Sequence, residues 1–386
     1  MEKMNQWIEI DAQAVRDNLH AIRLHLQANV ILMAVIKNNA YGHGLVETAR
    51  LLAAEGITHF AVTWLSEALL LREAGISGEI LLLAPAAAEE ISAAIQQNIT
   101  LSAASVPDVQ QICETAENLQ QTVRVHLKID TGLSRFGFLQ PQELHAAAEQ
   151  LLRCRFVTVD GAFTHMADAA DETASRQQFR YFQQSVEILE TAGIHPPFLH
   201  CANSGVFLKY PEMQLNMVRL GTLLCGQYPA GNFPHPFPLR DPFRYKTRIH
   251  SVRSLPAGSF LGYKRTWKLQ KAAQIAVIPV GYSDGLCLEA MSRPQSFFDL
   301  CKKALKLFLR YFGMSRFQPQ VRINGQLFPI RGKVFMQMAL VELPSAMELA
   351  PDTEAEVFIS KTLASPTVKR IIVEPEDARP ESEKIF

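Results

Sequence analysis

Two kinds of segment, distinguished by their pattern of apolar and polar positions, follow one another along the first two thirds of the chain. Short apolar or β-branched runs have the length and composition of buried parallel strands. Between them lie stretches rich in Ala, Leu and Glu, such as 64–74 and 141–153, which favour helices. The candidate strands are 30–36, 59–63, 79–84, 99–103, 123–129, 160–165, 198–202 and 217–221. Eight strand–helix units of this kind predict an α/β fold with an N-terminal (β/α)8 barrel.

The pattern changes after a stretch rich in Pro and Gly at 228–242, which predicts a linker. Beyond it, candidate strands are separated by turn residues with little helix: 247–255, 271–279, 320–323 and 339–343. We therefore expect the barrel over 1–238 and a C-terminal β-rich domain over 239–386. The end of that domain is rich in Glu, Pro and Arg, which predicts a flexible tail.

One segment of the second domain, at about 294–313, has a helical pattern instead. At about 100° per residue, its apolar residues fall on one broad face and its charged residues on the remaining side. A face this wide is not expected to stay in water. It either packs on its own β domain or at a dimer interface, or it makes a peripheral membrane contact through 296–312, which the neighbouring basic residues favour.

Composition narrows the class of protein. Lys plus Arg and Asp plus Glu number 38 each, so no overall charge favours nucleic acid. No apolar run reaches the ~18 residues of a membrane span, and the start of the sequence lacks the apolar region of a signal peptide. The six cysteines are scattered without a CxxC pair, which predicts neither a disulfide framework nor a metal site. We expect a cytoplasmic protein that binds no nucleic acid and no metal.

A lysine directly follows the first candidate barrel strand. Active sites of such barrels lie at the C-terminal ends of the strands, so Lys37 is expected at the barrel mouth. Partial burial there would lower the pKa of its amine and make the neutral form available to form a Schiff base. From its position alone, a solvent-facing loop lysine is an equal alternative.

The sequence around this lysine, AVIKNNAYGHG, resembles the cofactor-lysine motif of alanine racemases. Further motifs stand in that family's order over about residues 5 to 345: WIEIDAQAVRDNL, LKIDTGLSRFG, FTHMADA, HCANSG, VRLGTLLCG, LGYKRTW and PVGYSDG. The resemblance implies a racemase dependent on pyridoxal 5′-phosphate (PLP), with Lys37 as the Schiff-base lysine. It also implies interconversion of L- and D-alanine for cell-wall synthesis by a homodimer.

The resemblance assigns further cofactor contacts: Tyr41, His165, Asn203, Ser204, Arg219 and Gly221. Hydroxyl groups suit the phosphate, and a glycine lets the backbone approach it. Without the resemblance, ordinary turn chemistry explains Ser204 and Gly221, and a core position explains His165. Arg219 matches the arginine that faces the pyridine nitrogen of PLP. Because arginine stays protonated, that nitrogen accepts a hydrogen bond and the ring is a weaker electron sink, which favours racemisation over transamination or decarboxylation.

Racemisation needs proton-transfer groups on both faces of the substrate Cα, and the resemblance implies Lys37 and Tyr263. A tyrosine with a pKa near ~10 needs positive charge or hydrogen-bond donors nearby to act as a base. The resemblance places Tyr263 in the second domain, where it reaches the PLP of the other subunit, so the active sites are shared. It assigns the substrate carboxylate to Arg135 and Met336. Lys128 matches a lysine that is carbamylated in many members, with an unmodified lysine as the alternative.

Two parts of the chain depart from the family pattern. The motif that usually reads GRVCMD is GKVFMQ here, so Phe335 and Gln337 replace a cysteine and an aspartate. Residues 346–386 contain no tyrosine, where the family has one that contacts the phosphate. These departures leave open a racemase of another small amino acid, one of broad specificity, or a weakly catalytic PLP-binding relative.

Overall fold

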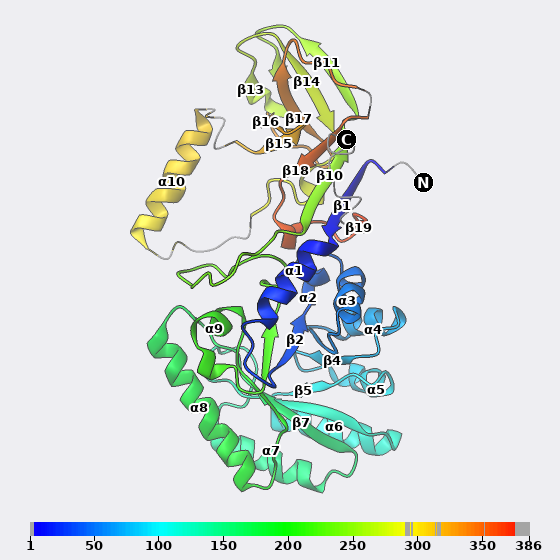
Figure 1. Cartoon of the computed structure of the whole chain (residues 1–386), viewed down its shortest axis with the longest axis vertical. Helices are drawn as coiled ribbons and strands as arrows, with labels where there is room; N and C mark the ends of the chain where they lie inside the picture. Colours follow the sequence, from blue (N-terminus) through cyan, green and yellow to red (C-terminus); the bar gives the residue numbers. More distant parts are fainter. Residues whose placement is uncertain are drawn as a thin grey trace. The chain divides into compact units, whose positions relative to one another are not determined.

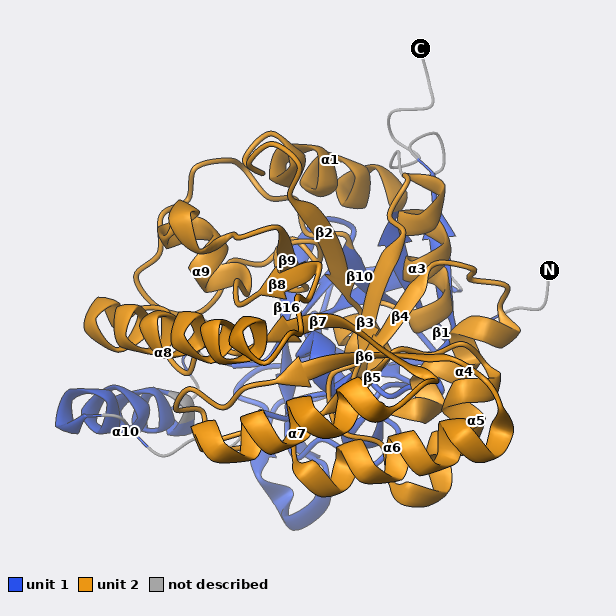
Figure 2. Ribbon diagram, turned by 90° about the horizontal axis from the view of Figure 1, so that it is seen from below, with its two compact units in different colours: residues 1–11, 243–386 blue, residues 12–242 orange. Residues whose placement is uncertain are grey.

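The computed structural model describes residues 4–289, 294, 296–312, 314, 318–350 and 352–374. The chain forms two compact units, one of residues 12–242 and one of residues 1–11 with 243–386 (Figure 2). The first strand, β1 (Gln6–Asp11), lies in the second of these units, between β10 (Phe243–Arg248) and β19 (Arg370–Val373). Our division at 238/239 instead assigned this strand to the barrel. The pattern of a single strand does not specify the sheet that it joins.

Residues 12–242 contain the eight strands that the sequence predicts: β2 (Ile31–Val35), β3 (His59–Val62), β4 (Glu79–Leu82), β5 (Leu101–Ala103), β6 (Val123–Lys128), β7 (Val157–Phe163), β8 (Phe198–His200) and β9 (Met217–Leu220). They pair in parallel in the orders β9-β2-β3-β4 and β5-β6-β7-β8. Hydrogen bonds from Thr100 N to Ile80 O and from Arg219 N to Ala202 O, both 2.9 Å, join the two groups at their edges. The predicted barrel is therefore confirmed.

Helices surround these strands (Figures 1 and 2): α1 (Ala12–Arg23), α3 (Leu45–Ala54), α4 (Leu65–Glu73), α5 (Ala88–Gln96), α6 (Val106–Leu119), α7 (Pro141–Arg153), α8 (Glu172–Thr191) and α9 (Ser204–Lys209). Their starts follow local chemistry. Ser105 caps α6 by accepting from Asp108 N, and Asp171 caps α8 by accepting from Ala174 N. The proline that opens α7 needs no backbone partner at that position.

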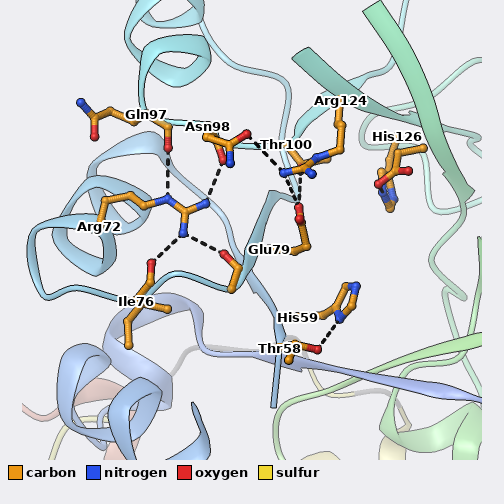
Figure 3. Close-up of polar contacts among 12 residues, drawn as sticks. Thr58, His59, Arg72, Ile76, Glu79, Gln97, Asn98, Thr100, Arg124 and His126 are labelled. Atoms are coloured by element: carbon orange, nitrogen blue, oxygen red, sulfur yellow. Dashed lines mark hydrogen bonds and ion pairs between the residues drawn. The ribbon is translucent and has the colours of Figure 1, made fainter. Parts of the chain in front are cut away.

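A polar cluster closes the N-terminal ends of several barrel strands (Figure 3). Arg72 on α4 donates to the carbonyl oxygens of four loop residues: Ile76, Gly78, Gln97 and Asn98. Arg124 pairs with Glu79 at 2.6 Å. Because loop carbonyls at a barrel end need partners, this cluster explains how the loops there are held. In barrels of this type that end serves stability rather than chemistry.

The other unit is β-rich, as expected. Its nine-stranded sheet has the order β11-β14-β17-β16-β15-β18-β10-β1-β19, with a separate β12-β13 pair. The strands not yet placed are β11 (Ser251–Leu255), β12 (Phe260–Leu261), β13 (Trp267–Lys268), β14 (Ala273–Ile278), β15 (Gln320–Ile323), β16 (Gln326–Arg331), β17 (Ala339–Pro344) and β18 (Glu354–Val357). The segment 247–255, predicted as one strand, is divided into β10 and β11. Ile249 N bonds to Thr353 O and His250 N bonds to Val277 O, so the chain changes partners there.

The predicted helix in the second domain is present as α10 (Phe297–Tyr311). No helix within the described part of the chain is both long and apolar enough to cross a membrane. The tail beyond residue 374 lies outside the described residues, so its predicted flexibility stays a prediction.

Candidate active site

The turn after β2 has an unusual backbone. In α2 (Lys37–Tyr41), Asn38, Asn39, Ala40 and Tyr41 have φ angles of 52°, 54°, 51° and 54°. Left-handed helical geometry costs L-residues roughly 1–2 kcal/mol each. Side-chain oxygens hold the turn: Asn39 accepts from Leu45 N at 2.7 Å, and Glu67 accepts from Asn38 N at 2.6 Å. A strained turn fixed in this way is typical of a functional site, and it positions Lys37 at the C-terminal end of β2.

A cavity of about 640 Å³ opens at this end of the barrel. Nine of the residues singled out from the sequence line it: Lys37, Tyr41, Lys128, Arg135, His165, Asn203, Ser204, Arg219 and Gly221. They follow the ends of β2, β6, β7, β8 and β9 or lie on them. Barrel closure thus brings together residues that are far apart in the sequence, at the end where barrel active sites lie.

Lys37 is half-buried, and burial lowers the pKa of its amine. The positive charges of Arg135 and Arg219 lower this pKa further, and Glu67 opposes them. A larger fraction of the amine is therefore neutral near pH 7 than for an exposed lysine. A neutral amine is the form that attacks a carbonyl carbon.

Lys128 lies deeper in the same cavity. Its Nζ donates to Leu83 O at 3.1 Å and lies 4.5 Å from the centre of the Phe163 ring. Burial, followed by the charges of Arg219 and Arg135, lowers the pKa of Lys128 to about 7. Its amine is therefore divided between neutral and charged forms near neutral pH.

Arg219 is 4% exposed and anchors a buried hydrogen-bond chain. Its Nη1 donates to His200 O at 2.8 Å and contacts His200 Nδ1 at 2.9 Å, and its Nη2 donates to Thr164 O at 2.7 Å. His200 Nε2 in turn lies 2.8 Å from Nδ1 of His126. Because an arginine only donates, His200 accepts at Nδ1 and carries its proton at Nε2, which it donates to His126.

Burial and the nearby arginine keep these histidines neutral. The pKa of His200 is well below its ordinary value, and burial lowers the pKa of His126 to about 3. Burial also lowers the pKa of Arg219 to about 10, so the guanidinium remains charged at neutral pH. His165, whose Nδ1 is 3.5 Å from Arg219 Nη2, likewise has its pKa lowered by burial. Sequence reasoning missed His126, although its inward position on β6 was the signal available.

One part of the cavity wall carries hydroxyl groups. Thr222 Oγ1 donates to Ser204 Oγ at 3.0 Å. A Cβ built on Gly221 would lie 2.5 Å from the hydroxyl of Tyr41, so only glycine allows this approach. Asn203 accepts from the amides of Gly205 and Val206 at 3.0 and 3.1 Å, so its side-chain oxygen caps α9. Thr222 was not singled out from the sequence.

The cavity suits an anionic cofactor with an aldehyde. Four basic side chains line it: Lys37, Lys128, Arg135 and Arg219. Among its described lining residues, Asp168 is the single carboxylate. The hydroxyl wall offers donors to phosphate oxygens, and Lys37 offers an amine to the aldehyde. These residues therefore fit PLP.

Tyr263 and Met336 belong to the other unit and are described within it. Tyr263 begins the short helix η2 (Tyr263–Arg265), is 66% exposed, and packs edge-on against Phe335 with 5.2 Å between ring centres. Met336 is also exposed, and its carbonyl accepts from Ser283 N and Oγ at 3.0 and 2.7 Å. Phe335, which departs from the family pattern, therefore contacts the predicted second base. The role of Tyr263 as the base opposite Lys37 and the role of Met336 at the substrate carboxylate remain predictions.

Comparison with known proteins agrees with this geometry. The alanine racemase N-terminal domain model matches residues 10–229, and the C-terminal domain model matches residues 243–374. Alanine racemase of Desulfovibrio desulfuricans is 33% identical over 354 residues, which is 91% of this chain and 88% of that protein. Alanine racemase 2 of Oceanobacillus iheyensis is 36% identical over 281 residues, or 72% of this chain and 71% of that protein.

Solved structures show the same similarity. Alanine racemase of Clostridium difficile superposes with a TM-score of 0.86 at 27% identity, over 97% of both chains. Histidine racemase of Leuconostoc mesenteroides superposes with a TM-score of 0.82 at 25% identity, over 97% of this chain and 99% of that one. The two domain models together with the relatives identify this chain as a member of the alanine racemase family, whose enzymes are PLP-dependent amino-acid racemases.

Proposed function

We propose that this protein interconverts L- and D-alanine by a two-base mechanism, with one proton-transfer group from each unit of the fold. The observation that carries the proposal is the cavity in which the Lys37 amine, whose pKa burial lowers, faces the same space as Arg219 and a wall of hydroxyls. When bound, PLP withdraws electrons from the substrate Cα and acidifies its proton.

The barrel residues hold the cofactor in this scheme. Lys37 would hold the cofactor through its aldehyde carbon until the substrate amine takes its place, which would free the Lys37 amine for proton transfer. The hydroxyls of Ser204 and Tyr41 would donate to its phosphate, with Ser204 oriented by the hydrogen bond that it accepts from Thr222, and the surrounding positive charge would also attract the phosphate. Arg219 donates toward its ring nitrogen. His200 and Thr164 fix the guanidinium, so Arg219 is rigid and charged when it does so.

A charged donor at the ring nitrogen supports racemisation over other reactions. Because arginine only donates, Arg219 would leave a ring nitrogen at this position unprotonated, and bound PLP would then be a weaker electron sink. A weaker sink would favour return of a proton to Cα over its return at the other atoms, the step that leads to transamination.

Proton transfer uses Lys37 on one face of Cα and Tyr263 of a partner subunit on the other. Removal of the Cα proton by one group and delivery of another proton to the opposite face by the other group would invert the configuration. Arg135 is the cationic group of the cavity proposed for the substrate carboxylate.

Alanine is proposed as the preferred substrate because the relatives at 33–36% identity are alanine racemases. Histidine is the second candidate, since a histidine racemase is a structural neighbour and Phe335 alters the second-domain motif. A racemisation screen separates them: purified protein with PLP is incubated with each L-amino acid, and D-product is measured by chiral chromatography. D-alanine is expected to dominate, and Lys37→Ala should form no D-product. A dominant product other than D-alanine would refute alanine as the preferred substrate, and no product at all would refute the proposed racemase activity.

The cofactor assignment has its own test. Reduction with borohydride in the presence of PLP, followed by peptide mapping, should place the pyridoxyl group on Lys37. A label on Lys128, the other lysine of the cavity with a lowered pKa, would contradict the assignment.

A further inference from the structure

Helix α10 has an apolar face that is wider than a helix usually presents to a protein neighbour. At 100° per residue its apolar side chains span about 200° of the circumference. They are Phe297, Phe298, Leu300, Cys301, Ala304, Leu305, Leu307, Phe308, Leu309, Tyr311 and, just beyond the helix, Phe312. The described charged side chains, Asp299, Lys302, Lys303 and Lys306, lie together on the remaining side. We call the apolar set the aromatic face of α10.

This face is exposed. Phe297, Phe308 and Tyr311 are 80%, 59% and 84% exposed. Three of its rings contact one another: Phe308 and Phe312 lie 4.7 Å apart between ring centres, and Tyr311 and Phe312 lie 5.4 Å apart. The predicted packing of this face on the β domain is therefore absent from the described residues. Exposed apolar surface of this extent indicates a binding partner.

The charges beside the face are mostly basic. The described charged residues of the helix are three lysines, Lys302, Lys303 and Lys306, and one aspartate, Asp299. The chain as a whole has no net charge. Lys302 Nζ lies 4.4 Å from the centre of the Phe298 ring, so its stem runs along the edge of the aromatic face. Lys303 and Lys306 pair with Asp299 and Glu289 at 3.3 and 3.5 Å, in exposed pairs that water and salt weaken. Lysines in this position can reach anionic lipid phosphates while their stems stay on apolar surface.

The width of the face distinguishes a lipid surface from a protein partner. A helix that packs on one protein element buries a stripe of about 100°, which would leave half of this face in water. A helix lying in a bilayer interface with its apolar side sunk about 5–10 Å is immersed over about half of its circumference. At 15 residues, α10 is about 22 Å long and shorter than the ~30 Å apolar core of a bilayer. It can lie on a membrane but not cross it.

We propose that α10 is a peripheral membrane anchor that lies in the interface of an anionic lipid bilayer, with its aromatic face toward the acyl chains and its lysines toward the headgroups. This property is independent of the proposed alanine racemisation. It would hold the protein at a membrane surface.

Vesicle co-sedimentation of the full chain with bound PLP tests the proposal. The probes are vesicles of phosphatidylcholine alone and of an equal mixture with phosphatidylglycerol. Wild type should pellet with the anionic vesicles and less so at high salt. Phe308→Glu should lower the partition into vesicles roughly tenfold or more, because it removes a ring that would be immersed in the bilayer and puts a charge in its place. Lys302→Gln with Lys306→Gln should lower it roughly fivefold per lysine on anionic vesicles.

Leu152→Glu is the matched control, because Leu152 on α7 is 57% exposed, close to the 59% of Phe308. It should pellet as wild type does. Tyr311→Glu, at an 84% exposed position where a change in folding is not expected, should repeat the loss seen with Phe308→Glu. Circular dichroism confirms that each variant is folded.

Wild type that stays in the supernatant with both kinds of vesicle would overturn the proposal. If Phe308→Glu then also changes the mass measured by light scattering while Leu152→Glu does not, the face is a protein interface. Equal pelleting of wild type, Phe308→Glu and Tyr311→Glu would place membrane binding elsewhere on the chain and would overturn the proposal too.

Discussion

Tyr263 illustrates how much a residue's role depends on its surroundings. Its ring contacts Phe335, and its side chain is otherwise largely exposed within its own unit. A phenol in water is a poor base at neutral pH. Its proposed role therefore requires cationic groups or hydrogen-bond donors close to its oxygen.

We expect Tyr263→Phe to lower racemisation at least ~100-fold, because it removes the ionisable oxygen and keeps the ring. PLP absorbance should be unchanged, since the residues proposed to hold the cofactor line the barrel cavity. Chiral chromatography measures the rate and absorbance spectroscopy the cofactor. A variant with near-normal rate would refute the two-base proposal for this chain.

Lys128 should react with carbon dioxide, and the reaction should depend on pH. Only the neutral amine forms a carbamate, and the pKa of about 7 makes the neutral form abundant above that pH and scarce below it. The carbamate is anionic, so the charges of Arg135 and Arg219 that disfavour the ammonium form would stabilise it. Nuclear magnetic resonance with 13C-bicarbonate should show a carbamate signal above pH ~7 that fades in more acidic buffer. The signal should vanish in Lys128→Met, and its persistence there would contradict the assignment.

The element that the structure explains most directly is the left-handed turn α2. Four consecutive non-glycine residues are held at positive φ by side-chain contacts with Leu45 N and Asn38 N. Sequence reasoning placed Lys37 after a strand, but it did not predict this turn. Its geometry depends on contacts with α4 and with the start of α3, which propensity does not report.

Ala40→Val should destabilise the protein by about 2–4 kcal/mol, because a β-branched side chain is a steric outlier at positive φ and the added methyl groups would enter a buried position. Ala40 has φ 51° and is fully buried. Chemical denaturation measures the free energy of unfolding. Ala53→Val on the exposed side of α3 is the control and should change that free energy by less than ~0.7 kcal/mol. Equal effects of the two substitutions would show that the left-handed geometry is not responsible.

At the scale of the whole molecule, the two proposed bases come from different units. Lys37 lies in the unit of residues 12–242, and Tyr263 lies in the other. If Tyr263 acts on a partner subunit, a mixed dimer of Lys37→Ala and Tyr263→Phe chains has one site with both defects and one with none. If it acts within its own chain, both sites of the mixed dimer are defective.

Mixing the two inactive variants should therefore restore about a quarter of wild-type activity when half of the dimers are mixed. Mass spectrometry of one isotope-labelled variant verifies that the subunits have exchanged. Exchange without any recovered activity would show that the sites are not shared in this way.

The amino-acid pattern alone was sufficient to predict the barrel strands, α7 and the helix at 297–311, because strand and helix periodicity are local properties of the chain. It was also sufficient to place Lys37 at the end of a barrel strand. It missed β16, whose apolar run is interrupted by Pro329, and β18, which has only four residues, two of them glutamates.

Only the tertiary structure decided the rest. The sheet that β1 joins, the meeting of Lys37 with Arg219 in one cavity, and the neutral His126 all depend on contacts between residues far apart in the sequence. The same holds for the pKa of Lys128, because desolvation by the surrounding barrel lowers it most. The sequence predicted the amphipathic pattern of α10, but only the folded chain could show that its aromatic face is left exposed, since the burial of a face depends on what the rest of the molecule places against it.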